Sequence, residues 1–128
     1  MIPYRTPYSL AGLVLLLLLA NASETQAKER NFTDLRLHEA RKIYSLHRKA
    51  ERLMNENEFE RAVNLYREIT FIEPDDAVAY TNMGSAYGAL GYTALARESY
   101  EDALDIEPDN MTALEGLRRI DDPDALAP

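Results

Sequence analysis

Apolar side chains recur along this chain with the spacing of helical faces. Because no Gly or Pro interrupts positions 34–55, the apolar stripe found there predicts one helix over these residues, with a break near Ala40 as the alternative. The members of this stripe are Leu35, Ile43, Leu46, Ala50 and Leu53. Similar patterns predict further helices over residues 59–72, 77–90, 93–106 and 111–120. The chain is therefore expected to be all-α.

The helical pattern repeats with a period of 34 residues. Residues 43–76 align with residues 77–110 without a gap, and six positions are identical. These are the pairs Ala62/Ala96, Tyr66/Tyr100, Ile72/Ile106, Glu73/Glu107, Pro74/Pro108 and Asp75/Asp109. A repeat of this length is one supersecondary unit that stacks on its neighbour. An α-solenoid of two helix hairpins is therefore predicted.

Residues of special shape mark the turns and the closest helix contacts. Gly91 is expected to adopt the left-handed conformation that ends a helix, and Asn57 is expected to do the same one repeat earlier. Pro74 and Pro108 each follow a predicted helix end. Small side chains are expected where helices approach closely, with tyrosines filling the gaps between them: Ala50, Ala62, Gly84 and Ala96, and Tyr66, Tyr87 and Tyr100.

The second copy resembles the tetratricopeptide repeat. The stretch Tyr80-Thr81-Asn82-Met83-Gly84-Ser85-Ala86-Tyr87, followed by Ala96, Tyr100, Ala103 and Pro108, has the aromatic, apolar-Gly, Tyr, Ala and Pro spacing of that family. The first copy differs at two positions, where Leu46 replaces the aromatic residue and Ala50 the Gly. The resemblance covers residues 43–110 and, more loosely, residues 111–120. It implies two helix hairpins with a C-terminal capping helix, preceded here by an extended N-terminal helix.

The first 22 residues have the pattern of a secretory signal peptide. Arg5 precedes an eleven-residue apolar run over positions 10–20, and Ala20-Asn21-Ala22 forms a small-x-small cleavage site. Cleavage after Ala22 is predicted, with a second candidate site after Ala27. The alternative is an uncleaved anchor, but a spanning helix needs about 20 apolar residues. An exported protein of the periplasm or cell envelope is expected, or a secreted one if the source is not bacterial, with no stable membrane span after cleavage.

The predicted organisation is a signal peptide over residues 1–22, a linker over residues 23–33, a repeat domain over residues 34–120 and an acidic tail over residues 121–128. The chain contains no Cys, which excludes both a disulfide and a lipid-modified Cys. Its net charge is −8. Removal of the signal peptide, which contains Arg5 and no acidic residue, changes the net charge to −9. This balance argues against nucleic-acid binding.

Charge is unevenly distributed between the two halves. Residues 28–67 carry a net charge of +3 and residues 68–128 a net charge of −11. The simpler interpretation is that these charges lie on solvated helix faces. The alternative is electrostatic guidance, in which the basic half faces a membrane surface or the acidic end of another copy.

No catalytic or metal-binding constellation is evident. His38 and His47 are nine residues apart, which places them on opposite faces of one helix. Each has an acidic neighbour four residues away, Asp34 and Glu51 respectively, and no third ligand completes a zinc site, so surface pairs are expected. Phosphate loops, nucleophile elbows and cysteine nucleophiles do not occur. No cofactor, no metal and no enzymatic activity are expected.

The resemblance implies that a partner segment binds in the concave groove formed by the first helix of each repeat. Carried onto this chain, the groove would be lined by Tyr44, His47, Arg48, Glu51, Asn55, Thr81, Asn82, Ser85, Glu115 and Arg119. Capture of a chaperone tail by Lys and Asn residues does not fit, since only Asn82 matches that scheme. The expected function is a non-enzymatic adaptor that binds a peptide or helix of another protein. The alternative is a self-assembling subunit in which the basic helix docks on the acidic second repeat.

Overall fold

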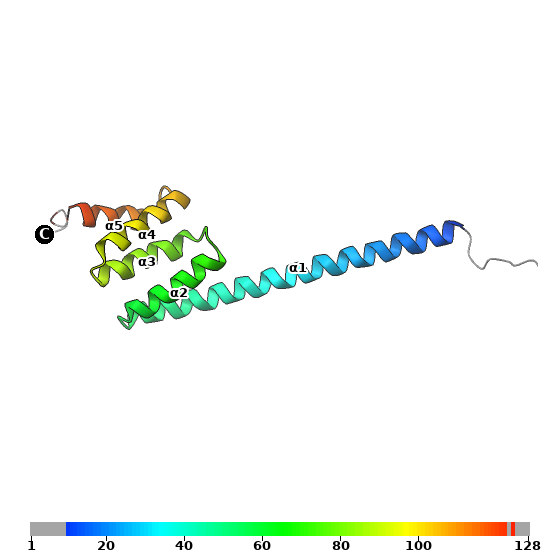
Figure 1. Cartoon of the computed structure of the whole chain (residues 1–128), viewed down its shortest axis with the longest axis horizontal. Coiled ribbons are helices and arrows are strands. Elements are labelled where there is room, and N and C mark those ends of the chain that lie inside the picture. The colour runs from blue at the N-terminus through cyan, green and yellow to red at the C-terminus, as the bar shows by residue number, and fades with distance from the viewer. Residues whose placement is uncertain (1–9, 123, 125–128) are drawn as a thin grey trace, which may run out of the picture. The chain divides into compact units, whose positions relative to one another are not determined.

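A computed structural model of the chain describes residues 10–122 and residue 124. It contains the helices α1 (Leu10–Asn55), α2 (Phe59–Ile72), α3 (Ala77–Ala89), α4 (Thr93–Ile106) and α5 (Met111–Asp121), and no strand within these residues (Figure 1). The chain divides into two compact units, Met1–Glu39 and Ala40–Pro128, so the boundary falls inside α1. The predicted all-α class is confirmed.

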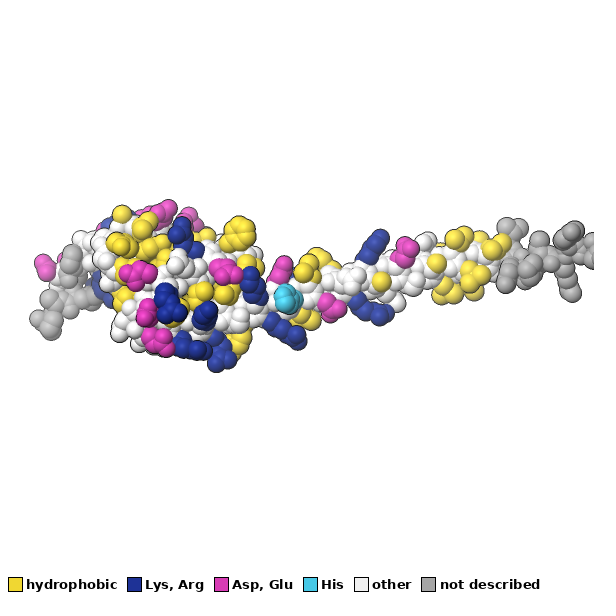
Figure 2. Space-filling view, turned by 60° about the horizontal axis from the view of Figure 1, so that its bottom comes forward, with side chains coloured by type: hydrophobic (Ala, Val, Ile, Leu, Met, Phe, Trp, Pro, Cys, Tyr) yellow, Lys and Arg dark blue, Asp and Glu magenta, His cyan; other side chains and the backbone are white. Residues whose placement is uncertain are grey.

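In the first unit, α1 begins at Leu10 rather than at residue 34. Residues 23–33, predicted to be a linker, are helical in α1, because this stretch lacks Gly and Pro and is rich in good helix formers. Leu13 to Leu19 are 48–65% exposed, and Figure 2 shows apolar side chains on this part of α1 beside the grey residues. No helix within the described residues is both long and apolar enough to cross a membrane. The Arg5 part of the predicted signal peptide lies outside the described residues.

In the second unit, each helix packs on the next along the chain. Contacts join α2 to α3, α3 to α4 and α4 to α5, and α5 also touches α3. Helices α2 and α4 have the bounds that were predicted, α3 ends one residue earlier and α5 one residue later. This confirms the predicted stack of two hairpins followed by a further helix. Of the predicted acidic tail, Asp121 belongs to α5, whereas residue 123 and residues 125–128 lie outside the described residues.

The two intra-repeat turns have the same backbone structure. Asn57 has φ 58° and Gly91 has φ 78°, as predicted. After α1, the N–H of Glu58 donates to the carbonyl of Leu53 at 2.8 Å, and after α3 the N–H of Tyr92 donates to that of Tyr87 at 2.9 Å. These are Schellman caps, which close the carbonyl end of a helix and turn the chain sharply into the next one.

The core forms two clusters that meet at α3. The first joins α1, α2 and α3 around the fully buried side chains of Tyr66 and Ile69. The second joins α4 and α5 around Tyr100, and the partly buried Tyr80 and Tyr87 contact both clusters. The predicted close contacts are present, since Ala50, Ala62 and Ala96 are 0% exposed and Gly84 is buried.

The ring of Tyr100 lies between two helix backbones. A Cβ added at Gly84 of α3 would come within 2.7 Å of the Tyr100 ring, and one added at Gly116 of α5 would collide with the same ring. Both helices therefore approach Tyr100 at a distance that only glycine permits.

Candidate functional site

The α1–α3 face is a surface depression between the first helices of the two repeats. It has a volume of about 510 Å³ and is lined by Tyr44, His47, Arg48, Glu51, Asp76 and Val78. Its apolar members are uncovered, with Tyr44 65% and Val78 51% exposed. Arg48 and Glu51 are exposed as well, and neither forms an ion pair with another described residue. An uncovered aromatic side chain beside unpaired charges is typical of interaction surfaces.

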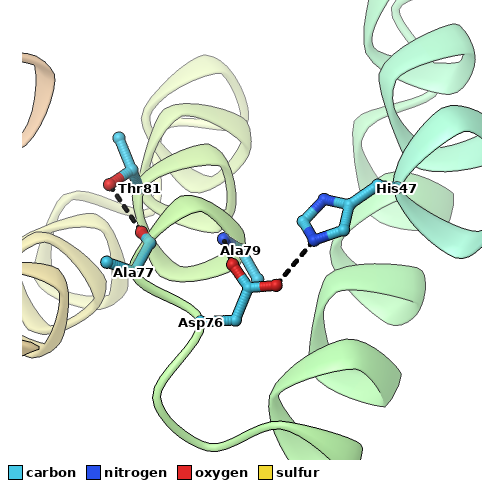
Figure 3. A network of polar contacts seen from close by, with 5 residues as sticks. All are labelled: His47, Asp76, Ala77, Ala79 and Thr81. Carbon is cyan, nitrogen blue, oxygen red and sulfur yellow. Dashed lines mark hydrogen bonds and ion pairs between the residues drawn. The ribbon is translucent and has the colours of Figure 1, made fainter. Parts of the chain in front are cut away.

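A hydrogen-bonded chain fixes the centre of this face (Figure 3). His47 Nε2 donates to Asp76 Oδ2 at 2.6 Å, and Asp76 Oδ1 accepts from the backbone N–H of Ala79 at 2.8 Å. Asp76 therefore acts as the N-cap of α3 and as the partner of His47. The predicted surface pair of His47 with Glu51 is wrong, because the stacking of α3 beside α1 brings in a carboxylate 29 residues away in sequence.

Tyr66 lies below the α1–α3 face. It is fully buried, and its ring centroid is 6.2 Å from that of His47. Burial raises the pKa of Tyr66 to about 12, the nearby carboxylate of Glu51 adds to the rise, and a hydrogen bond with Asn82 lowers it. Glu51, which lines this face, and the half-buried Asn82 therefore both act on the hydroxyl group of Tyr66.

A second depression, the α3–α5 pocket, lies among α3, α4 and α5. It has a volume of about 560 Å³ and is lined by Ser85, Gly88, Ala89, Thr93, Ala96, Tyr100, Gly116, Arg119 and Ile120. Ser85 Oγ lies 3.2 Å from the hydroxyl of Tyr100 and donates to the carbonyl of Thr81 at 3.1 Å. The lining thus combines small apolar side chains with a few hydroxyl groups and one guanidinium group.

The structure divides the ten predicted groove residues among several places. Tyr44, His47, Arg48 and Glu51 line the α1–α3 face, whereas Ser85 and Arg119 line the α3–α5 pocket. These six residues therefore line two separate depressions and not one continuous groove.

The remaining four residues line neither depression. Thr81 is only 5% exposed; its hydroxyl donates to the carbonyl of Ala77 at 2.8 Å and accepts from Asn110 at 3.1 Å, so the structure places it in the core instead of a groove. Asn82 is half-buried, and Asn55 is exposed at the end of α1. Glu115 forms an ion pair with Arg118 at 3.0 Å, which lowers the pKa of its carboxyl group.

Several lining residues were not predicted. Asp76 is the N-cap of α3 and Val78 lies in its first turn, whereas Gly88, Thr93 and Gly116 line the α3–α5 pocket. The 34-residue register contains the signal that was missed, since Val78 is the counterpart of Tyr44 and Gly88 that of Met54. Comparing side-chain volumes at equivalent positions would have indicated both sites. Within the described residues, no group of three or more His, Cys, Asp or Glu side chains is placed to hold a metal ion.

A stack of helix hairpins with a 34-residue period defines the class of helical repeat proteins. The family model described as "Tetratricopeptide repeat" matches residues 77–110, which supports a tetratricopeptide repeat protein. A repeat of this family suggests a role in protein–protein interaction.

Curated relatives are similar to part of this chain. The chain is 41% identical over 56 residues to the human protein O-mannosyl-transferase TMTC3, which covers 44% of this chain and 6% of that protein. It is 34% identical over 73 residues to human TMTC1 and 33% identical over 73 residues to mouse TMTC1, covering 57% of this chain and 8% of each relative. The chain thus spans less than a tenth of the length of these relatives.

Proposed function

We propose that this protein is an exported, non-enzymatic adaptor that holds a segment of a partner protein on its α1–α3 face. One observation carries this proposal: Tyr44 and Val78 are uncovered at equivalent positions of successive first helices, beside the unpaired Arg48 and Glu51. Uncovered apolar anchors with flanking charges suit a peptide or helix that brings one apolar side chain and complementary charges.

Two sequence features support the remaining parts of the proposal. The signal-peptide pattern over residues 1–22 supports export to the periplasm or cell envelope, or secretion from a non-bacterial source. The lack of a recognisable catalytic motif supports a binding role. The names of the relatives describe O-mannosyl transfer, but the matched segment is 6–8% of their length, so we propose a shared repeat module and not that activity.

Affinity capture tests the adaptor. The full chain serves as bait for envelope or secreted fractions of the source cell, beside a Tyr44→Ala/Val78→Ala variant and a matched Phe71→Ala control. Phe71 is 88% exposed on α2 and lies outside the α1–α3 face. We expect one protein to be captured by the wild type and the control and lost with the double variant. Equal recovery by all three baits would rule out the α1–α3 face.

A second candidate function, self-assembly, is favoured by two charged surfaces of the second unit. On α1, Arg41, Arg48, Lys49 and Arg52 are exposed, and none forms an ion pair with another described residue. On α4, four carboxylates share one stripe: Glu98, Glu101, Asp102 and Asp105. Partial burial and the neighbouring charges of Glu98, Asp105 and Glu101 raise the pKa of Asp102. The two stripes could join copies head to tail.

Charge reversal tests this assembly. One variant carries Arg48→Glu and Arg52→Glu, and the other carries Glu98→Arg and Glu101→Arg. We expect the wild type to sediment as oligomers at low salt and as a monomer at high salt, because exposed charges are screened within about 8–10 Å at physiological ionic strength. Each variant alone should be monomeric, and their mixture should associate again. A wild-type monomer at low salt and high concentration would eliminate this candidate.

A further inference from the structure

The α3–α5 pocket exists because the second repeat lacks two large side chains that the first repeat has. In the 34-residue register, Gly88 is the counterpart of Met54, and Thr93 is the counterpart of Phe59. Met54 and Phe59 are both partly buried and pack against the first core cluster. Gly88 and Thr93 instead line a depression of about 560 Å³, and a Cβ at Gly88 would meet no atom within 4 Å.

The pocket has the dimensions and lining of a ligand site. Sites for small groups are usually concave spaces of about 300–1,000 Å³ with a mostly apolar lining and a few polar groups. Here the apolar part comes from small residues, Ala89 and Ala96 among them, and from Ile120. The space left by Gly88 and Thr93 corresponds to the side chains of Met54 and Phe59 in the first repeat.

The polar groups of the pocket favour an anionic group beside that apolar one. Ser85 uses its hydroxyl proton in the bond to the carbonyl of Thr81, so Tyr100 donates to Ser85 Oγ. Both hydroxyl protons are thus used within the protein, and the guanidinium group of Arg119 is the charged donor left for a ligand. Arg119 is exposed and stands at the edge of the pocket. Of the basic residues in α3, α4 and α5, Arg97 and Arg118 are paired with Asp121 and Glu115, whereas Arg119 forms no ion pair with a described residue.

We propose that the α3–α5 pocket receives one bulky apolar side chain of the partner peptide, of phenylalanine or methionine size, and that an adjacent acidic residue of this peptide pairs with Arg119. This inference rests on the proposed adaptor function and adds a second contact point to it. The partner would then be anchored at two places, by the α1–α3 face and by this pocket. An acidic residue next to Phe or Met is the sequence feature that such a partner should contain.

Peptide titration followed by NMR tests the pocket on the full chain. The probe is a blocked peptide, acetyl-Gly-Phe-Asp-Gly-amide, with two control peptides in which Phe is replaced by Ala or Asp by Asn. We expect saturable shifts at the backbone amides of Ala89, Ala96 and Ile120 with the probe and none with the Ala peptide. The Asn peptide should bind several-fold more weakly, because it lacks the charge that meets Arg119.

Protein variants separate the pocket from the rest of the surface. Gly88→Met/Thr93→Phe restores the residues of the first repeat and should weaken binding of the probe about tenfold or more, which is the effect of losing one anchor contact. Arg119→Gln should weaken binding of the Asp peptide and leave binding of the Asn peptide unchanged. The Tyr44→Ala/Val78→Ala variant is the matched control and should bind the short probe like the wild type.

The outcomes distinguish this inference from the adaptor proposal. Undiminished binding to the filled variant, or equal binding of the Phe and Ala peptides, would overturn the pocket and leave the α1–α3 face untouched. The Arg119→Gln comparison does not depend on the filled variant being folded. A chain ending at Asp122 tests whether the last six residues occupy the pocket. If their removal shifts the same amides and strengthens probe binding, the occupant is the chain's own tail and the partner inference fails.

Discussion

Tyr100 illustrates how single residues set the distances between helices in this protein. Its ring contacts α3 at Gly84 and α5 at Gly116, and only 5% of the residue remains exposed. One aromatic side chain therefore joins three helices, and its two glycine neighbours have a packing role that the bare repeat pattern does not reveal.

The glycine contacts predict opposite effects of the same substitution. Gly84→Ala and Gly116→Ala should each destabilise the fold by about 1–3 kcal/mol, because the added methyl group would overlap the Tyr100 ring. Gly88→Ala is the matched control and should stabilise α3 by about 0.5–1 kcal/mol, since its Cβ meets no neighbour and Ala favours the helix. Urea unfolding measures all three. A stabilised Gly116→Ala variant would contradict this packing.

Buried Tyr66 predicts a loss of stability at alkaline pH. Its folded-state pKa of about 12 lies above the ordinary value of 10.0, so the folded chain keeps a proton that the unfolded chain releases. The stabilising contribution is complete below pH 10 and is lost as the pH rises towards 12. Relative to Tyr66→Phe, the wild type should lose about 2 kcal/mol between pH 9 and pH 12 in urea unfolding. Parallel pH profiles of the two proteins would refute this.

At the scale of elements, helix ends define the repeat. Asp76 caps α3 by accepting from the N–H of Ala79, and Asn110 caps α5 by accepting from the N–H of Ala113 at 3.0 Å. Both caps also contact another helix, since Asp76 accepts from His47 and Asn110 donates to Thr81. Local helix initiation and the stacking of successive helices thus depend on the same side chains.

The double role of Asp76 predicts how its variants differ. Asp76→Ala should destabilise the protein by about 2–3 kcal/mol, because it removes the cap and leaves the half-buried His47 without its acceptor. Asp76→Asn keeps the capping oxygen and should cost less than half as much. Thermal unfolding with both variants checks this order, and equal destabilisation by the two variants would contradict the capping role of Asp76. A loss of only about 1 kcal/mol for Asp76→Ala, the usual effect of losing a cap alone, would show that the contact with His47 contributes nothing.

At the scale of the whole molecule, the stack depends on its terminal helix. Helix α5 covers the second core cluster, in which Ala113 is 0% exposed and Leu117 and Ile120 pack against Tyr100 and its neighbours. Repeat arrays need such a covering element at each end, because an open end exposes the apolar face of the last hairpin.

Removal of α5 should therefore destabilise the entire second unit. A chain ending at Asp109 is expected to melt about 10 °C or more below the wild type, since about 1 kcal/mol corresponds to 4–8 °C in a domain of this size. A chain ending at Asp122 retains α5 and serves as the control, with an unchanged melting temperature. Circular dichroism and light scattering would follow unfolding and aggregation. Equal melting of both truncated chains would show that α5 does not stabilise the stack.

The 34-residue period, the turn residues and the small-residue positions were sufficient to predict the second unit. Helices α2 and α4 have the predicted bounds, and Asn57 and Gly91 adopt the predicted left-handed conformation. These features depend on interactions within one repeat, which neighbouring residues determine. The start of α1 was not predicted, because the apolar run over residues 10–20 is typical of a signal peptide and this pattern does not indicate whether the residues after it are helical.

For the second unit, the sequence by itself determined which segments are helical, where they end to within one residue and that they stack, because propensity, capping and the repeat act over short distances along the chain. Only the tertiary structure decided which side chains meet across the stack. It paired His47 with Asp76, buried Thr81, and opened the α3–α5 pocket where Gly88 and Thr93 replace larger residues. The reason is physical: these contacts depend on the distance and rotation between packed helices, which neighbouring residues do not specify.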